Sequence, residues 1–268
     1  MSIVEAVVLG AVQGLTEFIP ISSSGHLVIV PELFGWERPG LSFDVLLHAA
    51  SLLALLIYFS GDLLDLARGI RHGSHGSKRL VALLAVGTVP AGLAGLLLAD
   101  FFEDQFEDAK AAALQLLITA AVLVVAEWVS QRRDAAAARE GKPLRGTDDL
   151  GLHEAGAIGV AQALAIFPGI SRSGSTIGTG LALGLSRDDA ARFAFLLAIP
   201  ALAGAAVVKI PDLGATSLTL GAGIAGFISS AVASYAAITG LIRYLKSNTL
   251  YPFAVYCVIA SIIFTILL

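Results

Sequence analysis

The sequence has a single cysteine and very few charged residues. Cys257 has no second thiol with which to form a disulfide within the chain, and a cysteine-based metal site is excluded for the same reason. Only 14% of the 268 residues are charged, about half the usual share in globular proteins. With 56% hydrophobic residues and a mean hydropathy of +0.83, the chain is predicted to be a polytopic, all-α membrane protein. No basic segment precedes the first apolar run, so we expect no cleaved signal peptide.

Apolar runs divide the chain into predicted membrane segments. Roughly 20 residues cross the hydrocarbon core as a helix, and six runs are long enough: 41–60, 80–99, 111–129, 190–210, 218–242 and 250–268. Two further apolar regions, 3–36 and 155–185, are interrupted by Pro20 and by Pro168-Gly169. Because irregular backbone at membrane depth must be buried in protein or line a cavity, each is predicted to be a re-entrant helical hairpin.

The two interrupted regions are copies of one sequence. An ungapped alignment of 5–25 with 154–174 gives 10 identities in 21 positions. We therefore divide the chain into a first repeat at 1–131, a polar cytoplasmic linker at 132–151 and a second repeat at 152–268. Each repeat holds one hairpin and three spans, and three is odd, so the second repeat is expected to be inverted. In transporters built from inverted repeats, the broken helices meet near the membrane midplane. We therefore expect the tips of the two hairpins to touch.

Basic residues alternate between the predicted loops. One side holds 13 of the 17 lysines and arginines, and the other keeps Arg38, Lys110 and Lys209 with the acidic stretch 100–108. Lysine and arginine are enriched in cytoplasmic loops. We therefore expect a plasma-membrane protein with both termini outside and a site open to the extracytoplasmic side. The 13 residues on the cytoplasmic side are Arg68, Arg71, Lys78, Arg79, Arg132, Arg133, Arg139, Lys142, Arg145, Arg187, Arg192, Arg243 and Lys246.

The first interruption carries a carboxylate, hydroxyls and an imidazole. Gln13 and Glu17 are spaced i, i+4 and share a helix face, and Pro20 ends that helix. The serines Ser22, Ser23 and Ser24 can cap the next helix, whose first turn holds His26. A helix N-terminus attracts anions and disfavours a charged imidazole. His26 is therefore predicted to be neutral, as a nucleophile or a proton acceptor.

The second interruption adds a guanidinium. Its hydroxyls belong to Ser171, Ser173, Ser175 and Thr176. Arg172 lies among them and provides a planar fork suited to phosphate oxygens. Two opposed helix N-termini with these groups predict an anion site, most plausibly for phosphate. A carboxylate is out of place in a purely anion-binding pocket, so Glu17 is interpreted as a proton acceptor or a metal ligand.

Structural roles compete with these assignments. Glu17 alone could cap backbone amides, His26 could be a packing residue, and Arg172 could be a structural partner of Glu17. Serines in membrane helices usually bond back to their own backbone. His48 and Glu127 are interpreted as mainly structural, and the aligned Glu5 and Glu154 as part of the scaffold at the hairpin entrances.

These motifs resemble the undecaprenyl-diphosphate phosphatase family of integral membrane proteins, which is associated with bacitracin resistance. The first family motif has an acidic residue or Gln, three residues, then Glu, followed by Pro, serines, Gly and His; it matches Gln13, Glu17, Pro20 and 22–26. The second motif, Pro-Gly-x-Ser-Arg-Ser-x-x-Thr, matches 168–176. The similarity covers the whole chain, and the two motifs together are highly specific.

The resemblance implies removal of the terminal phosphate of a polyprenyl diphosphate, C55 or similar, which recycles the lipid carrier for cell-envelope glycans. It makes Glu17, His26 and Arg172 catalytic, and it implies a divalent cation, Mg²⁺ or Ca²⁺, with Glu17 and Gln13 as ligands. The expected partners are the lipid substrate and membrane lipid, with no nucleic acid; a homodimer is left open. The implied substrate-binding residues are Gln13, Ser22, Ser23, Ser24, Ser171, Ser173, Ser175 and Thr176.

The sequence differs from the family pattern at two positions, and it leaves two mechanisms open. Gln13 lies where many members have Glu, and His48 lies where a neutral amide residue is expected. In one mechanism His26 attacks the terminal phosphorus and Glu17 then directs water; in the other Glu17 activates water for direct attack and His26 is the general acid. A polyprenyl-phosphate flippase or an anion transporter is the alternative function, because inverted repeats with opposed hairpins are typical of carriers.

Overall fold

A computed structural model describes residues 1–38, 40–98, 101–102, 108–209 and 218–268. Over these residues the chain forms 11 α-helices and one 3-10 turn, and no β-strand occurs in this part of the chain. The predicted span ends at 99 and 210, and most of the acidic stretch 100–108, lie outside the described residues. The helices are α1 (Ile3–Phe18), α2 (Ser23–Phe34), α3 (Leu41–Tyr58), α4 (Ser60–Arg71), α5 (His75–Leu97), α7 (Ala109–Glu140), α8 (Leu152–Leu164), α9 (Arg172–Ala182), α10 (Arg187–Lys209), α11 (Leu220–Leu245) and α12 (Tyr251–Leu267), with the 3-10 turn at Thr147–Asp149.

Both predicted hairpins are helix–break–helix units, α1–α2 and α8–α9, and their helices are capped in the same way. A capping box formed with Glu5 begins α1, and the Glu154 carboxylate accepts from the Gly151 amide at the start of α8 at 2.7 Å. Ser22 and Ser171 cap α2 and α9 by accepting from the backbone amide three residues later. These residues align between the copies, so the repeated sequence specifies a repeated local structure.

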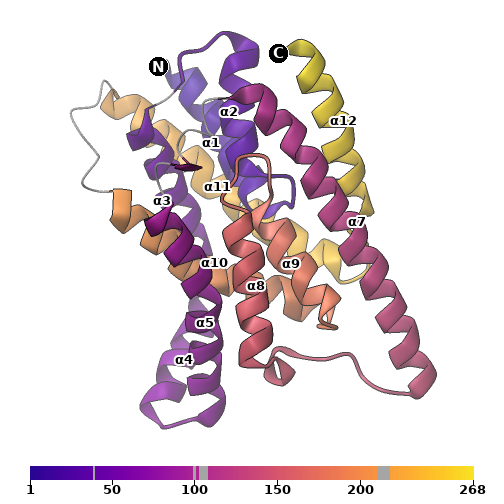
Figure 1. Ribbon diagram of the computed structural model, residues 1–268. Helices are drawn as coiled ribbons and strands as arrows, with labels where there is room; N and C mark the ends of the chain where they lie inside the picture. Colours follow the sequence, from indigo (N-terminus) through magenta and orange to yellow (C-terminus); the bar gives the residue numbers. More distant parts are fainter. Residues whose placement is uncertain (39, 99–100, 103–107, 210–217) are drawn as a thin grey trace.

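The two breaks meet. A Cβ placed on Gly25 would lie 2.9 Å from the Cα of Gly169, and the Ser173 hydroxyl donates to the Ile19 carbonyl at 3.4 Å. The prediction that the tips touch is therefore confirmed. In Figure 1, α1 and α2 lie in the upper part of the molecule with both chain termini, whereas α8 and α9 lie below them. The turn between α4 and α5 and the segment after α7 lie at the opposite end from the termini.

Glycines allow each hairpin to pack backbone-to-backbone against a long helix. A Cβ on Gly10 of α1 would lie 2.4 Å from the Gly226 carbonyl oxygen of α11. A Cβ on Gly159 of α8 would lie 2.4 Å from the Gly87 carbonyl oxygen of α5. Small residues permit this close approach between membrane helices. Gly10 and Gly159 align in the two copies, so the packing of the hairpins is repeated as well.

The membrane-spanning content is defined by four long apolar helices, α5, α7, α10 and α11. A fifth span results if α3 and α4, which are bent by 68° at their junction, are taken as one. The apolar helix α12 has 17 residues, so at ~1.5 Å per residue it is somewhat shorter than the ~30 Å hydrocarbon core. Helix α7 continues through Glu140, so the predicted linker at 132–151 begins as an extension of that helix.

Aromatic side chains form the core beside the breaks. Phe18, at the end of α1, packs edge-on against Phe195 of α10 with ring centroids 5.4 Å apart, and Phe59 contacts the same ring. All three are fully buried. The core thus lies directly beneath Glu17 and fixes the end of α1, on which the candidate site is built.

Candidate active site

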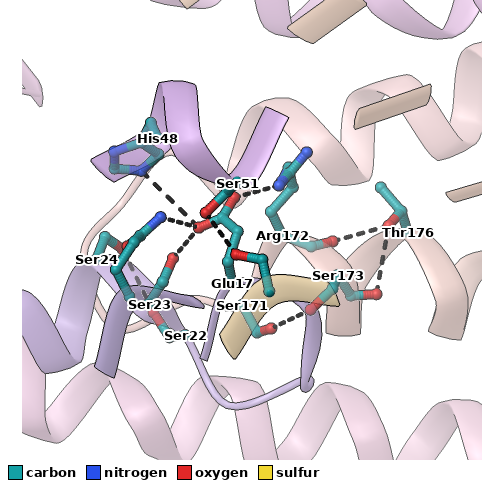
Figure 2. A network of polar contacts seen from close by, with 12 residues as sticks. Glu17, Ser22, Ser23, Ser24, His48, Ser51, Ser171, Arg172, Ser173 and Thr176 are labelled. Atoms are coloured by element: carbon teal, nitrogen blue, oxygen red, sulfur yellow. Dashed lines mark hydrogen bonds and ion pairs between the residues drawn. The ribbon is translucent and has the colours of Figure 1, made fainter. Parts of the chain in front are cut away.

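Glu17 is the centre of the polar cluster shown in Figure 2. It lies in the last turn of α1 and is only 5% exposed. Arg172 of α9 donates to its Oε1, and Ser23 of α2 donates to its Oε2. The Gln13 amide donates to Oε2 at 3.0 Å, and Nε2 of His48 on α3 lies 3.8 Å from the same oxygen. Side chains of four helices therefore converge on one carboxylate.

The hydroxyls of the second break face the first break and their own helix. Ser171 accepts from the Gly174 amide at 3.1 Å and lies 3.2 Å from the Ser173 hydroxyl. Thr176 bonds back to carbonyls of its own helix, as expected for a hydroxyl in an apolar setting. The predicted Ser175 is buried nearby at 5% exposure. Among these four side chains, Ser173 makes the contact across to the first break, through the Ile19 carbonyl.

The serines of the first break divide into a capping pair and Ser23. The Ser22 hydroxyl accepts from the Gly25 amide at 3.3 Å and lies 3.4 Å from that of Ser24. Ser22 also has a φ of 71°, a conformation that is uncommon for a residue with a side chain. Residues held in such conformations cluster at functional sites. The turn places Ser23, and not its neighbours, against Glu17.

Thr119 of α7 fixes the second break, and sequence reasoning missed it. Its hydroxyl donates to the Gly169 carbonyl at 2.7 Å and accepts from the Ser171 amide at 2.9 Å. Gly169 has a φ of 94°, and a Cβ there would lie 2.3 Å from the Ala112 carbonyl oxygen. Glycine is therefore required at this position. Thr119 is 50 residues away in an otherwise apolar helix, where no local signal marks it.

Two buried polar atoms at the cluster lack a partner within the described residues: Nη1 of Arg172 and Oε1 of Gln13. A buried donor or acceptor without a hydrogen bond costs roughly 1–3 kcal/mol, so such atoms need an explanation. The first is a cationic donor suited to a phosphate oxygen, and the second is a neutral oxygen suited to a cation. Both atoms therefore support a ligand at Glu17.

His26 faces α12 instead of the carboxylate cluster. Its Nδ1 lies 2.7 Å from the Ser22 carbonyl oxygen and its Nε2 lies 2.7 Å from the Tyr256 hydroxyl. The ring stacks on Tyr256 and meets Phe264 edge-on. A carbonyl can only accept, so Nδ1 donates and Nε2 accepts from the tyrosine. Tyr256 is 230 positions away, and nothing in the sequence near His26 indicates this partner. The catalytic role of His26 stays a prediction.

The glutamates predicted to be structural have structural contacts. Glu127 is fully buried and accepts two bonds from Arg187, at 2.7 and 2.9 Å, and one from the Leu250 amide. Glu154 accepts two bonds from Arg145, at 2.7 and 2.8 Å. The hydrogen-bonded Arg145 guanidinium lowers the pKa of the Glu154 carboxyl to about 2. Both glutamates anchor helix ends outside the cluster.

The fold and the site together define a helical membrane protein with a buried polar site between two broken helical hairpins. The chain belongs to the family described as bacitracin resistance protein BacA, whose model matches residues 6–263.

Three relatives of similar length have the same name. A protein of Methanosphaera stadtmanae is 41% identical over 283 residues, covering 100% of this chain and 98% of its own. A protein of Geobacter sulfurreducens is 41% identical, and the match covers 97% of this chain and 96% of that protein. A protein of Mycobacterium avium is 42% identical, and the match covers 97% of this chain and 95% of that protein. All three are named undecaprenyl-diphosphatase. These names do not favour the flippase or transporter alternative.

Proposed function

We propose that this protein hydrolyses undecaprenyl diphosphate to the monophosphate and inorganic phosphate, and so recycles the lipid carrier of cell-envelope glycan synthesis. The observation that carries the proposal is the buried Glu17–Arg172–Ser23 cluster at the meeting of the two hairpins, where one donor of Arg172 has no partner among the described residues. Membership of the BacA family and the names of the relatives point the same way. A carrier would need no serine hydroxyl bonded to a carboxylate.

Arg172 and the helix starts would bind the diphosphate. Nη1 of Arg172, which has no partner in the described part of the chain, can take a phosphate oxygen while Nη2 stays on Glu17. Helices α2 and α9 begin at the junction of the tips and present their positive ends to it. The serines of both breaks and Thr176 would supply further donors, and the prenyl chain would lie in the bilayer. Charge neutralisation by fixed donors is the main requirement of phosphoryl transfer.

Glu17 and Ser23 would carry the covalent chemistry. Ser23 already donates to Glu17, so the carboxylate can take the hydroxyl proton as Ser23 Oγ bonds to the terminal phosphorus. The bond from that phosphorus to the bridging oxygen breaks, and undecaprenyl phosphate leaves. Glu17 passes that proton to the departing phosphate and becomes a carboxylate again. It then deprotonates the water that cleaves the phosphoserine, and this second proton restores the Ser23 hydroxyl as inorganic phosphate leaves. Attack by His26 is the less supported version, because Nε2 would first have to lose Tyr256.

Glu17 and Gln13 would hold a divalent cation, Mg²⁺ or Ca²⁺. The residues present fit such an ion, because the buried Gln13 Oε1 lacks a partner beside the Glu17 carboxylate and both ions prefer oxygen ligands. When bound, the cation would neutralise charge on the transferring phosphoryl group. With a single carboxylate, substrate oxygens and water would complete its coordination.

The membrane arrangement that we propose is a pair of inverted repeats with six spans. Matching caps, matching break positions and the aligned Gly10 and Gly159 contacts support two copies of one unit. In Figure 1 the termini lie together, opposite the α4–α5 turn and the segment after α7, which hold many of the basic residues. This charge distribution supports a terminal end that lies outside, with the site open to that side.

Two experiments test these proposals. The first is phosphate release by purified full-length protein from undecaprenyl or farnesyl diphosphate, with and without EDTA; absence of release under both conditions rejects the function. The second is labelling of single cysteines in a Cys257→Ser background by an impermeant reagent in intact cells. Glu37→Cys should react and Lys142→Cys should not, and the reverse pattern would invert the topology.

A further inference from the structure

We propose that His48 is a ligand of the divalent cation, through Nε2, and that the site therefore prefers a cation that accepts nitrogen, such as Mn²⁺, over Ca²⁺. The proposal rests on the proposed function, because it concerns the same carboxylate. It adds a ligand from α3 to the pair on α1, and it gives a role to a residue that the sequence motifs leave unexplained.

The hydrogen bonding of His48 leaves the correct nitrogen available. Nδ1 lies 2.7 Å from the backbone carbonyl oxygen of Asp44, one turn earlier in α3. A carbonyl can only accept, so Nδ1 donates to it, and Nε2 is the ring nitrogen that remains for a ligand. Histidines that bind metals usually donate their other N–H in this way, which fixes the tautomer and the ring orientation.

Nε2 of His48 faces the candidate carboxylate. It lies 3.8 Å from Oε2 of Glu17, and Figure 2 shows the ring directed at that oxygen. A separation of 3.8 Å is one that two ligands of a single ion can have, given metal–ligand bonds of ~2.0–2.2 Å.

The other groups around Oε2 complete a mixed donor set. Gln13 has a buried oxygen without a partner in the part of the chain that the structure describes, and the Ser23 hydroxyl touches the carboxylate. Oxygen ligands alone suit Mg²⁺ and Ca²⁺, whereas an imidazole shifts preference toward the transition-series cations. The His48 side chain is 33% exposed, so the protein does not fully cover this side of the candidate site.

Pulsed EPR of Mn²⁺ bound to the purified full-length protein tests the proposal, because it detects a coordinated imidazole nitrogen independently of activity. We expect nitrogen coupling in the unsubstituted protein, measured with and without pyrophosphate, and its loss in His48→Gln. Competition with Ca²⁺ should show the Mn²⁺ preference falling by about tenfold in that variant. His72→Gln is the matched control, because His72 makes the same 2.7 Å bond to a carbonyl one turn earlier but lies exposed at the end of α4.

The outcomes separate this proposal from the proposed function. No Mn²⁺ binding, no nitrogen coupling, or coupling that persists in His48→Gln would each overturn the ligand assignment and would fit a protonated His48 paired with Glu17. Phosphate release would then still stand on its own assay. If His48→Gln does not fold, the EPR measurement is made on His26→Gln. Nitrogen coupling that persists in His26→Gln supports His48 as the ligand, and loss of the coupling in His26→Gln overturns that assignment. Nitrogen coupling without phosphate release would reject the function and keep the ligand.

Discussion

Glu17 and Arg172, 155 positions apart in the sequence, form an ion pair where the two hairpins meet. The Glu17 side chain is 4% exposed and that of Arg172 is 18% exposed. Removing one partner of a buried pair leaves an uncompensated charge and typically costs about 3–5 kcal/mol. Tests of function at this pair therefore need substitutions that keep the charge.

Arg172→Lys should lose most of the activity while the protein still folds. The ammonium keeps the positive charge near Glu17 but cannot contact both the carboxylate and a phosphate oxygen as a planar fork. Loss of one such donor typically costs about 100-fold or more in turnover. Phosphate release measures the effect, with thermal unfolding as the folding control. Turnover near that of the unsubstituted protein would place Arg172 outside the phosphate site.

Ser23→Ala should reduce phosphate release far more than Ser24→Ala. Of these two serines, Ser23 donates to Glu17, whereas the Ser24 hydroxyl lies 3.4 Å from that of the capping Ser22. Rapid acid quench with labelled substrate should trap phosphate on the unsubstituted protein and on Ser24→Ala, in an acid-stable form, and not on Ser23→Ala. Equal losses in the two variants would argue for water as the direct nucleophile.

Tyr256→Phe should lower turnover by about tenfold if His26 acts by holding the first break. The substitution removes the donor to Nε2 but keeps the stacked ring, and a buried hydrogen bond of ~1–1.5 kcal/mol corresponds to about that factor. A nucleophilic His26 would instead be freed by it. Higher turnover in Tyr256→Phe, with acid-labile phosphate that disappears in His26→Ala, would restore His26 as the attacking group.

Gly159→Ala should destabilise the protein, whereas Gly156→Ala should not. A Cβ at Gly159 meets a backbone carbonyl at 2.4 Å, but at Gly156 the nearest atom is a Val86 methyl at 3.7 Å. Overpacking costs typically ~1–3 kcal/mol, while alanine at an open helical site gains ~0.5–1 kcal/mol over glycine. Thermal unfolding in detergent compares them. Equal unfolding temperatures would contradict the close contact of α8 with α5.

Acid should weaken the entrance of the second hairpin through Glu154. Its pKa is lowered from 4.5 to about 2 by the hydrogen-bonded Arg145. Its stabilising contribution is therefore complete above pH ~4.5 and is lost as the pH falls toward 2. Unfolding temperatures across that window should fall less steeply in Glu154→Gln than in the unsubstituted protein. Parallel curves would mean that this pair does not contribute.

Short-range features of the fold could be predicted because they depend on local chemistry. Pro20 and Pro168-Gly169 predicted both breaks, serines predicted the caps, and the repeat with its odd number of spans predicted that the breaks meet. The bend between α3 and α4 was not predicted, because an apolar run conceals where one helix ends and an amphipathic one begins.

The partners of the site residues could be predicted only in part. Arg172 was considered as a partner of Glu17 because their charges are opposite. Thr119 and Tyr256 were missed, because each acts through contacts made by a helix distant in the sequence. Hydroxyls of that kind look the same in a sequence whether they bond to their own helix or to a neighbour.

The two copies of the repeated sequence differ at the residues that form the Glu17–Arg172 ion pair. Glu17 is matched by Ile166 in the other copy, and Arg172 by Ser23. Two identical subunits related by symmetry would have to place the same residues at both tips, so each tip would hold the carboxylate and the guanidinium together. Joining the copies in one chain lets each position change alone. One tip could become acidic and the other basic, which a dimer encoded by a single half-length gene could not achieve.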